Sequence, residues 1–220
     1  MSFGDAEDVL SPQSSVLSPS LRLLRLFIAL ETNDAMQQAI AAAQQTLRRR
    51  GDLPVRWTNP TQAHLTLQFL GDVVAEHVPG LVQAVKPAVA RHGALFLRSG
   101  DVGAFPSADA PRVLWLGVRG DEARLLALQH AVAGVVVSVE GVVADRKAFR
   151  PHLTLGRVRN GQRDMPGLHA IAAALTRPVA VPPAAWPVGA VSLIRSVLGP
   201  GGPLYTTLER LPLGGGATTS

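Results

Sequence analysis

Cysteine is absent from the 220 residues of this chain. Its absence excludes a disulfide framework, a thiolate metal site and a cysteine nucleophile, and it is compatible with a reducing compartment. Lysine is nearly absent too, because Lys86 and Lys147 are the only two. The net charge of +5 and the sequence pI near 10.9 therefore come mainly from arginine, which binds phosphate through two parallel N–H donors. This charge favours a polyanionic partner, with an ordinary basic surface as the alternative.

The chain also lacks a long apolar run. The longest stretch without charge, residues 178–194, contains four prolines, and arginines interrupt the other apolar runs before they reach spanning length. Asp5, Glu7 and Asp8 stand where a secretory signal needs positive charge followed by an apolar segment. We therefore expect no export signal, no membrane segment and a cytoplasmic location.

Composition divides the chain into one domain and two tails. Residues 1–20 are rich in serine and proline, and residues 214–220 contain only glycine, alanine, threonine and serine, so we expect both to be disordered. The 47% hydrophobic content is sufficient for a packed core between them. Residues 21–213 are therefore predicted to form one two-lobed domain of the α+β class, which we expect to be monomeric.

Hydrophobic periodicity and turn residues predict the elements of this domain. Asn33 is a suitable N-cap for an Ala/Gln-rich helix that Gly51 ends, and Gly71-Asp72 is expected to close a strand. The expected helices are residues 33–50, 76–91, 121–133 and 168–175, and the expected strands are residues 23–30, 55–57, 64–70, 95–98, 113–119, 135–139, 152–158, 190–195 and 205–211.

A repeated tetrapeptide, His-Leu-Thr-Leu, begins at His64 and again at His152. Because side chains two residues apart in a strand share a face, each histidine points the same way as Thr66 or Thr154. An imidazole can act as acid or base near neutral pH, and hydroxyls can bind phosphoryl oxygens, so the set suits phosphate-ester chemistry. The alternative is two ordinary strand histidines. One copy in each half of the chain predicts a duplication with two similar lobes.

The other histidines give no sign of a metal site. They are His77, His92, His130 and His169, and no two of them have the i, i+4 spacing of helical metal ligands. We therefore expect neither a metal nor any other cofactor.

Several longer segments carry a resemblance to a known family. They are RLFIAL from Arg25, VRWTNPTQAHLTLQFLGDV from Val55, GAFPS from Gly103, PRVLWLGV from Pro111, FRPHLTLGRV from Phe149 and VSLIRSVLGPGGPLY from Val191. In this order they resemble the two-histidine phosphoesterases, and within them the RNA 2′,3′-cyclic phosphodiesterases, also called the 2′-5′ RNA ligase family.

The resemblance implies a bilobal α+β fold. Two pseudo-symmetric lobes would line a central V-shaped cleft with antiparallel sheets, with helices packed outside and both His-Leu-Thr-Leu segments on the cleft floor. Arg157 matches the family pattern after the second segment and would bind phosphate, with a surface ion pair as the alternative. Phe27 and Tyr205 would border the nucleoside, although aromatic residues at strand spacing are more often part of a core.

The resemblance also implies an activity. His64 would be the proton donor and His152 the proton acceptor in hydrolysis of an RNA terminal 2′,3′-cyclic phosphate to a 2′-phosphate, without a metal, and with minor reverse 2′-5′ ligation. The pseudo-symmetry leaves the opposite assignment of the histidines open. The alternatives are a phosphodiesterase acting on cyclic mononucleotides or 2′-5′ oligonucleotides, and a non-catalytic module that binds RNA ends.

Overall fold

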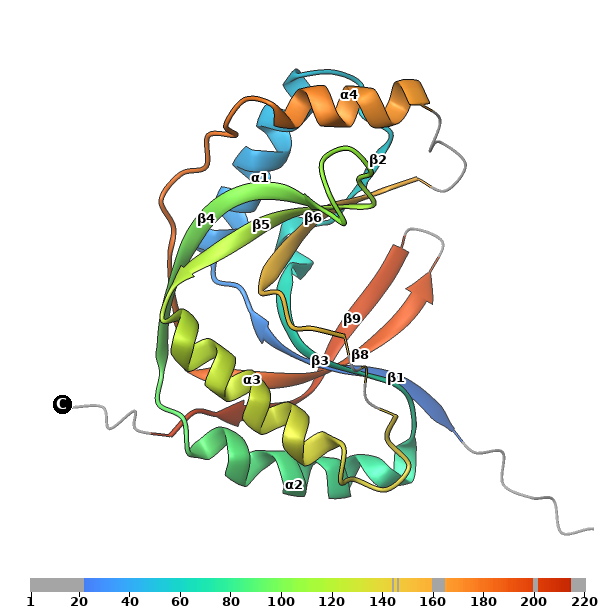
Figure 1. Ribbon diagram of the computed structural model, residues 1–220. Helices are drawn as coiled ribbons and strands as arrows, with labels where there is room; N and C mark the ends of the chain where they lie inside the picture. Colours follow the sequence, from blue (N-terminus) through green and yellow to red (C-terminus); the bar gives the residue numbers. More distant parts are fainter. Residues whose placement is uncertain (1–21, 144, 146, 160–164, 200–201, 215–220) are drawn as a thin grey trace, which may run out of the picture.

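The computed structural model describes residues 22–143, 145, 147–159, 165–199 and 202–214. The tails expected to be disordered lie outside these residues, apart from Gly214. Two antiparallel sheets occupy the middle of the molecule, and helices cover their outer sides (Figure 1). The predicted α+β class with antiparallel sheets is thus confirmed. In the described part of the chain, no helix is long and apolar enough to cross a membrane.

The first sheet has the strand order β3-β1-β8-β9. Its strands are β1 (Leu23–Glu31), β3 (His64–Val74), β8 (Ala190–Gly199) and β9 (Gly202–Pro212). Along β1, the alternate residues Leu24, Leu26, Ile28 and Leu30 belong to the main core. The residues between them face the other way, with the period of two expected for a strand, and Phe27 and Ala29 are buried there in a second, smaller cluster.

The second sheet has the strand order β2-β6-β5-β4-β7. Its strands are β2 (Val55–Trp57), β4 (Leu95–Phe105), β5 (Val113–Gly120), β6 (His152–Val158) and β7 (Ala185–Val188). Neither sheet comes from one half of the chain, because β8 and β9 complete the first sheet and β2 lies at the edge of the second. The His-Leu-Thr-Leu segments begin β3 and β6, so each sheet contains one of them.

Four α-helices lie outside the sheets within the described residues (Figure 1). They are α1 (Asp34–Arg49), α2 (Val78–Ala90), α3 (Glu122–Val136) and α4 (Met165–Leu175), and two short 3₁₀ helices are η1 (Pro60–Gln62) and η2 (Ala75–His77). As predicted, the side chain of Asn33 caps α1 by accepting the Met36 N–H at 3.0 Å. Helix α1 packs against the second sheet, while α2 and α3 pack against the first.

Several predicted boundaries differ from the structure. The strand expected at residues 135–139 is wrong, because α3 continues to Val136. Val132 and Val136 are fully buried at helical spacing with Leu125 and Leu128, and this packing outweighs the preference of valine for strands. Strand β4 extends to Phe105 instead of ending near residue 98.

Gly71 does not end its strand, and one strand was not predicted. Gly71 has φ 67°, and the register against β1 shifts next to it, so β3 continues through a bulge to Val74. The unpredicted strand β7 contains Pro187, which reads as a strand breaker in the sequence. It pairs only with β4, at the edge of its sheet, where a strand accommodates proline.

Candidate functional site

The two His-Leu-Thr-Leu strands have the same local structure. In both HLTLQFL from His64 and HLTLGRV from His152, the first, third and sixth side chains are accessible and the other four are buried. The two buried residues in succession mark a bulge, because the register shifts past Leu67 in β3 and past Leu155 in β6. The bulge brings the sixth residue onto the face of the histidine and threonine, and this residue is Phe69 in one strand and Arg157 in the other.

A buried glutamine supports each bulge. The side-chain amide of Gln44, on α1, donates to the Leu155 carbonyl at 2.9 Å and to the Thr58 carbonyl at 2.7 Å. Gln129, on α3, donates to the Leu67 carbonyl at 3.3 Å. The Leu155 carbonyl also accepts the Thr58 N–H at 3.0 Å, so Gln44 adds a second donor to it and joins it to the Thr58 carbonyl. Because a bulge disrupts the ladder and buried carbonyls need donors, both glutamines stabilise the distortion that shapes the site. The helix from each half of the chain supports the motif of the other half.

Both imidazoles are oriented by the backbone in the same way. The Nδ1–H of His64 donates to the Gln62 carbonyl at 2.9 Å, and that of His152 donates to the Arg150 carbonyl at 2.6 Å. Because a carbonyl oxygen only accepts, these bonds place a proton on Nδ1 and leave Nε2 to exchange protons with a ligand. Each strand therefore presents the same imidazole nitrogen.

Different aromatic side chains contact the two imidazoles. The His64 ring lies 4.6 Å from the Phe27 ring and 4.8 Å from the Tyr205 ring, between centroids. The His152 ring is nearly perpendicular to the Phe105 ring, with 5.0 Å between centroids, and the Phe105 ring lies 5.3 Å from the Trp115 ring. These contacts restrict ring rotation and replace water around the imidazoles.

The structure gives the two aromatic residues predicted to border a nucleoside different surroundings. Phe27 is only 3% exposed and packs with Ala29 and Ile194, so its ring supports His64. Tyr205 is half-buried and lines a cavity beside His64. Sequence reasoning missed Phe105, which contacts His152, although the GAFPS segment contained it.

The surroundings lower the pKa of both imidazoles. Burial is the main cause of the lowered pKa of His64, and the charges of Arg157 and His152 lower it further, against the Gln62 hydrogen bond and Glu31, which raise it. Burial likewise lowers the pKa of His152, with a further contribution from Arg157, against the Arg150 hydrogen bond. Strands β3 and β6, which carry the two histidines, are in contact, and the charge of Arg157 acts on both imidazoles.

Arg157 is exposed and occurs in no ion pair among the described residues. Its charge also opposes the burial that raises the pKa of Tyr205. Each motif thus presents an imidazole and a hydroxyl on one accessible face, and the second motif adds the guanidinium of Arg157. Such a set can bind a phosphate ester and protonate or deprotonate its oxygens. In the part of the chain that the structure describes, no group of three or more His, Asp or Glu side chains could hold a metal ion.

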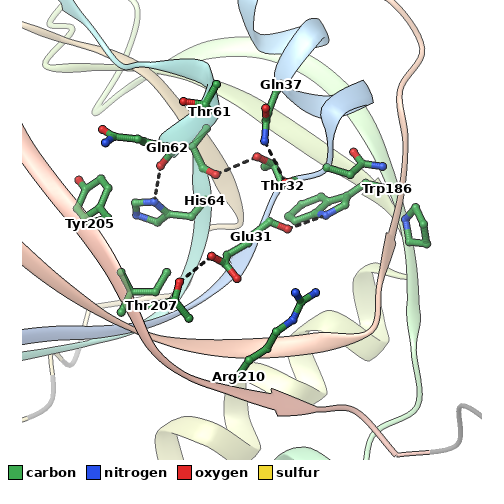
Figure 2. A pocket seen from close by; sticks show the side chains of 14 residues that line it. Glu31, Thr32, Gln37, Thr61, Gln62, His64, Trp186, Tyr205, Thr207 and Arg210 are labelled. Atoms are coloured by element: carbon green, nitrogen blue, oxygen red, sulfur yellow. Dashed lines mark hydrogen bonds between the residues drawn. The ribbon is translucent and has the colours of Figure 1, made fainter.

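A cavity of about 430 Å³ lies beside His64, between the two sheets (Figure 2). Glu31 lies next to His64 in it, because these residues are directly opposed in the β1–β3 pair. Sequence reasoning missed Glu31, since only the register reveals its position. The cavity is lined by Glu31, Thr32, Asn33, Gln37, Thr61, Gln62, Ala63, His64, Trp186, Pro187, Ile194, Tyr205, Thr207 and Arg210.

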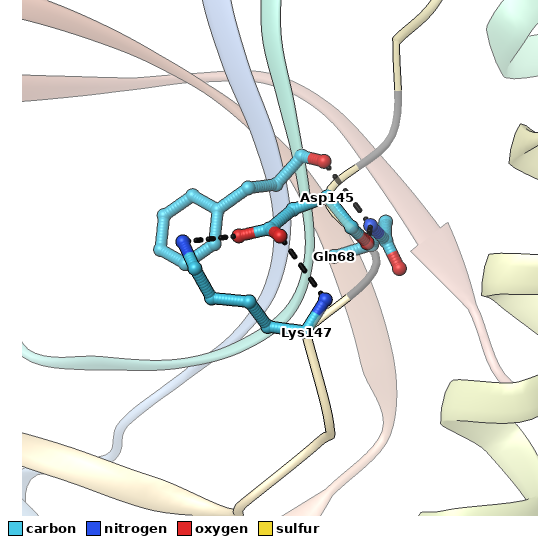
Figure 3. A network of polar contacts seen from close by, with 4 residues as sticks. Gln68, Asp145 and Lys147 are labelled. Carbon is cyan, nitrogen blue, oxygen red and sulfur yellow. Dashed lines mark hydrogen bonds and ion pairs between the residues drawn. The ribbon is translucent and has the colours of Figure 1, made fainter. Parts of the chain in front are cut away.

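A polar network fixes part of the segment that precedes β6 (Figure 3). The Gln68 amide donates to the Asp145 carbonyl at 2.8 Å, and the Asp145 N–H donates to the Phe69 carbonyl at 3.1 Å. The Asp145 carboxylate accepts both the backbone N–H and the ammonium group of Lys147, each at 3.1 Å. These contacts attach the segment leading to His152 to strand β3, which carries His64.

Comparison with known proteins identifies relatives over most of the chain. The family model of the 2′-5′ RNA ligase superfamily matches residues 32–200. A protein of Thermus thermophilus named RNA 2′,3′-cyclic phosphodiesterase is 34% identical over 200 residues, which are 87% of this chain and 91% of the relative. A protein of Methanothermobacter thermautotrophicus with the same name is 31% identical over 186 residues, 84% of this chain and 97% of the relative.

The fold is similar to that of a solved structure. A crystal structure of a Thermus thermophilus protein superposes with a TM-score of 0.69 and 28% identity, and the match covers 88% of this chain and all of the other. The expected two-sheet α+β arrangement is therefore found in an experimentally determined protein as well.

Proposed function

Since the chain belongs to the 2′-5′ RNA ligase superfamily, we propose that it hydrolyses terminal 2′,3′-cyclic phosphates of RNA through His64 and His152. The observation that carries the proposal is the matched pair of motifs, each with its imidazole Nδ1 bound to a backbone carbonyl. Each imidazole thus keeps Nε2 available for the substrate. The names of the curated relatives support the same reaction.

In the proposed reaction, Nε2 of His152 removes a proton from water as the water oxygen bonds to phosphorus. The bond from phosphorus to the ribose 3′ oxygen breaks, and Nε2 of His64 protonates that oxygen. Thr66, Thr154 and Arg157 stabilise the charge on the non-bridging oxygens. The product is a 2′-phosphate with a free 3′-hydroxyl. The two histidines then exchange protonation states through solvent.

The lowered pKa values of the two histidines suit this division of roles. A neutral imidazole forms readily near neutral pH, and the charge of one imidazole opposes protonation of the other. After one histidine has bound a proton, its charge makes protonation of the other less favourable. The site therefore contains one charged and one neutral histidine over a range of pH. The reverse reaction, 2′-5′ ligation with a 5′-hydroxyl, exchanges the two roles and is minor in water.

The test uses an oligonucleotide with a terminal 2′,3′-cyclic phosphate, and phosphorus NMR identifies the product. We expect a 2′-phosphate from the wild-type protein and at least about a hundredfold less from His64→Ala and His152→Ala. Tight binding without turnover would instead indicate a module that binds RNA ends. Faster turnover of cyclic mononucleotides or 2′-5′ oligonucleotides would identify one of the alternative substrate classes.

The proposal extends to a monomeric enzyme in the cytoplasm that acts without a metal ion. Sedimentation of the purified protein and fractionation of cells would test its oligomeric state and location. Removing residues 1–20 and 215–220, which lie outside the described residues, should leave turnover of the cyclic phosphate unchanged.

A further inference from the structure

The cavity beside His64 has a fixed acceptor at its centre. The Glu31 carboxylate accepts hydrogen bonds from the Ser192 hydroxyl at 2.7 Å and from the Thr207 hydroxyl at 2.8 Å, one on each oxygen. The backbone carbonyl of Glu31 accepts the indole N–H of Trp186 at 3.0 Å. A carboxylate has about four acceptor positions, so two remain for a ligand at a fixed place.

Donors and apolar surface surround this acceptor. Figure 2 shows Arg210 and Trp186 on the other side of Glu31 from His64. Arg210 is exposed and has no ion pair among the described residues, so its guanidinium is available as a donor. Pro187 and Ile194 add apolar lining. An acceptor, a planar donor and apolar walls match an uncharged heteroaromatic ring with hydrogen-bonding edges, whereas the charge of Glu31 disfavours a second phosphate.

The proposed reaction places the nucleoside on the same side. The leaving 3′ oxygen stays attached to ribose, and in an in-line displacement it departs opposite the attacking water. Because His64 protonates this oxygen, the ribose lies toward His64 and the water toward His152. His64 lines the cavity and His152 does not. The volume of about 430 Å³ falls within the range of roughly 300–1,000 Å³ for small-molecule sites.

We propose that this cavity is the subsite for the terminal nucleoside, with the Glu31 carboxylate accepting donors of the base and Arg210 donating to its acceptors. The inference rests on the proposed function, because the in-line argument uses His64 as the acid. The pseudo-symmetry of the two motifs ends here, since Glu31 is opposed to His64 in the β1–β3 pair, whereas Gly117, which has no side chain, is opposed to His152 in the β5–β6 pair. Glu31 therefore selects the nucleoside and distinguishes the side of His64 from that of His152.

Glu31→Gln and Arg210→Gln test the subsite, with calorimetric binding of guanosine 2′-monophosphate and of inorganic phosphate as the measurement. Guanine offers an amino group and a ring N–H to one carboxylate, and phosphate occupies only the site of the histidines. We expect each variant to weaken nucleotide binding about tenfold or more while phosphate binding changes less than about threefold. Arg91→Gln removes the same charge at the end of α2, away from the cleft, and should bind both ligands as the wild type does.

Two results would overturn the subsite. If nucleotide and phosphate binding fall together, the cavity is part of the phosphate site, and if neither falls, the base binds elsewhere. Arg210→Gln keeps the test valid if Glu31→Gln disturbs the β8–β9 hairpin through Ser192 and Thr207. Because binding is measured without turnover, failure of the subsite is distinguishable from failure of the proposed reaction, which hydrolysis of the oligonucleotide reports.

Discussion

Gln44 on helix α1 is a positioning residue for the His-Leu-Thr-Leu segment that begins at His152. In Gln44→Leu the Thr58 carbonyl loses the amide donor at 2.7 Å, and the Leu155 carbonyl loses the amide donor at 2.9 Å but keeps the Thr58 N–H at 3.0 Å. One carbonyl left without its donor costs about 1–3 kcal/mol, and the added apolar surface of leucine recovers part of this. We expect the free energy of unfolding to fall by about 1–2 kcal/mol, which lowers Tm by about 2–4 °C per kcal/mol.

The same substitution should reduce turnover more than its effect on stability requires. The Leu155 carbonyl lies at the bulge that brings Arg157 onto the face of His152 and Thr154. A shift of about 1 Å in catalytic groups can cost about a hundredfold in rate, so kcat should fall while the protein remains folded. Restoring the amide in a shorter side chain, Gln44→Asn, should recover little, because asparagine does not reach both carbonyls.

Gln45→Leu is the matched control, since Gln45 is the next residue of α1 and is exposed. It should unfold and turn over as the wild type does. Thermal unfolding followed by circular dichroism, and kcat measured well below Tm, provide the comparison. If Gln44→Leu matches Gln45→Leu in both measurements, the bulge does not depend on the glutamine and the reasoning is wrong.

The remaining predictions concern the same site. Gly103→Ala places a Cβ 2.6 Å and 2.8 Å from Trp115 ring carbons, so it should lower the free energy of unfolding by about 1–3 kcal/mol and disturb the packing of Trp115, Phe105 and His152. In the control Gly134→Ala the Cβ has no atom within 4 Å and should stabilise the helix, so equal thermal stability of the two variants would contradict this. His64→Ala and His152→Ala should each lower kcat about 10²–10⁴-fold, and the double variant should lose far less than the product, as kinetics would show. The charge of Arg157 lowers the pKa of both histidines, so Arg157→Gln should raise both pKa values and move the bell-shaped pH profile of kcat/KM to higher pH. A profile at the wild-type position would be evidence against this coupling. Turnover of the cyclic phosphate should persist in excess EDTA after dialysis, and a loss that a divalent ion reverses would refute the metal-free mechanism.

Much of the fold was readable from local patterns. The Asn33 cap, the helix after it and the strands that begin at His64 and His152 follow from capping preference and period-two alternation, both of which act within a few residues. The strand wrongly predicted at residues 135–139 failed because burial of Val136 on α3 decided its conformation. Strand β7 was missed because its pairing with β4 is a contact between distant parts of the chain.

The sequence by itself determined the four motif residues and the face that each histidine shares with its threonine, since the period of a strand is a local property. Only the tertiary structure decided what lies beside them. The contact of Phe105 with His152, the register that opposes Glu31 to His64 and the glutamines that cross to the motif of the other half all join residues far apart in the chain. Such contacts depend on how two sheets and their helices pack, which no local spacing records.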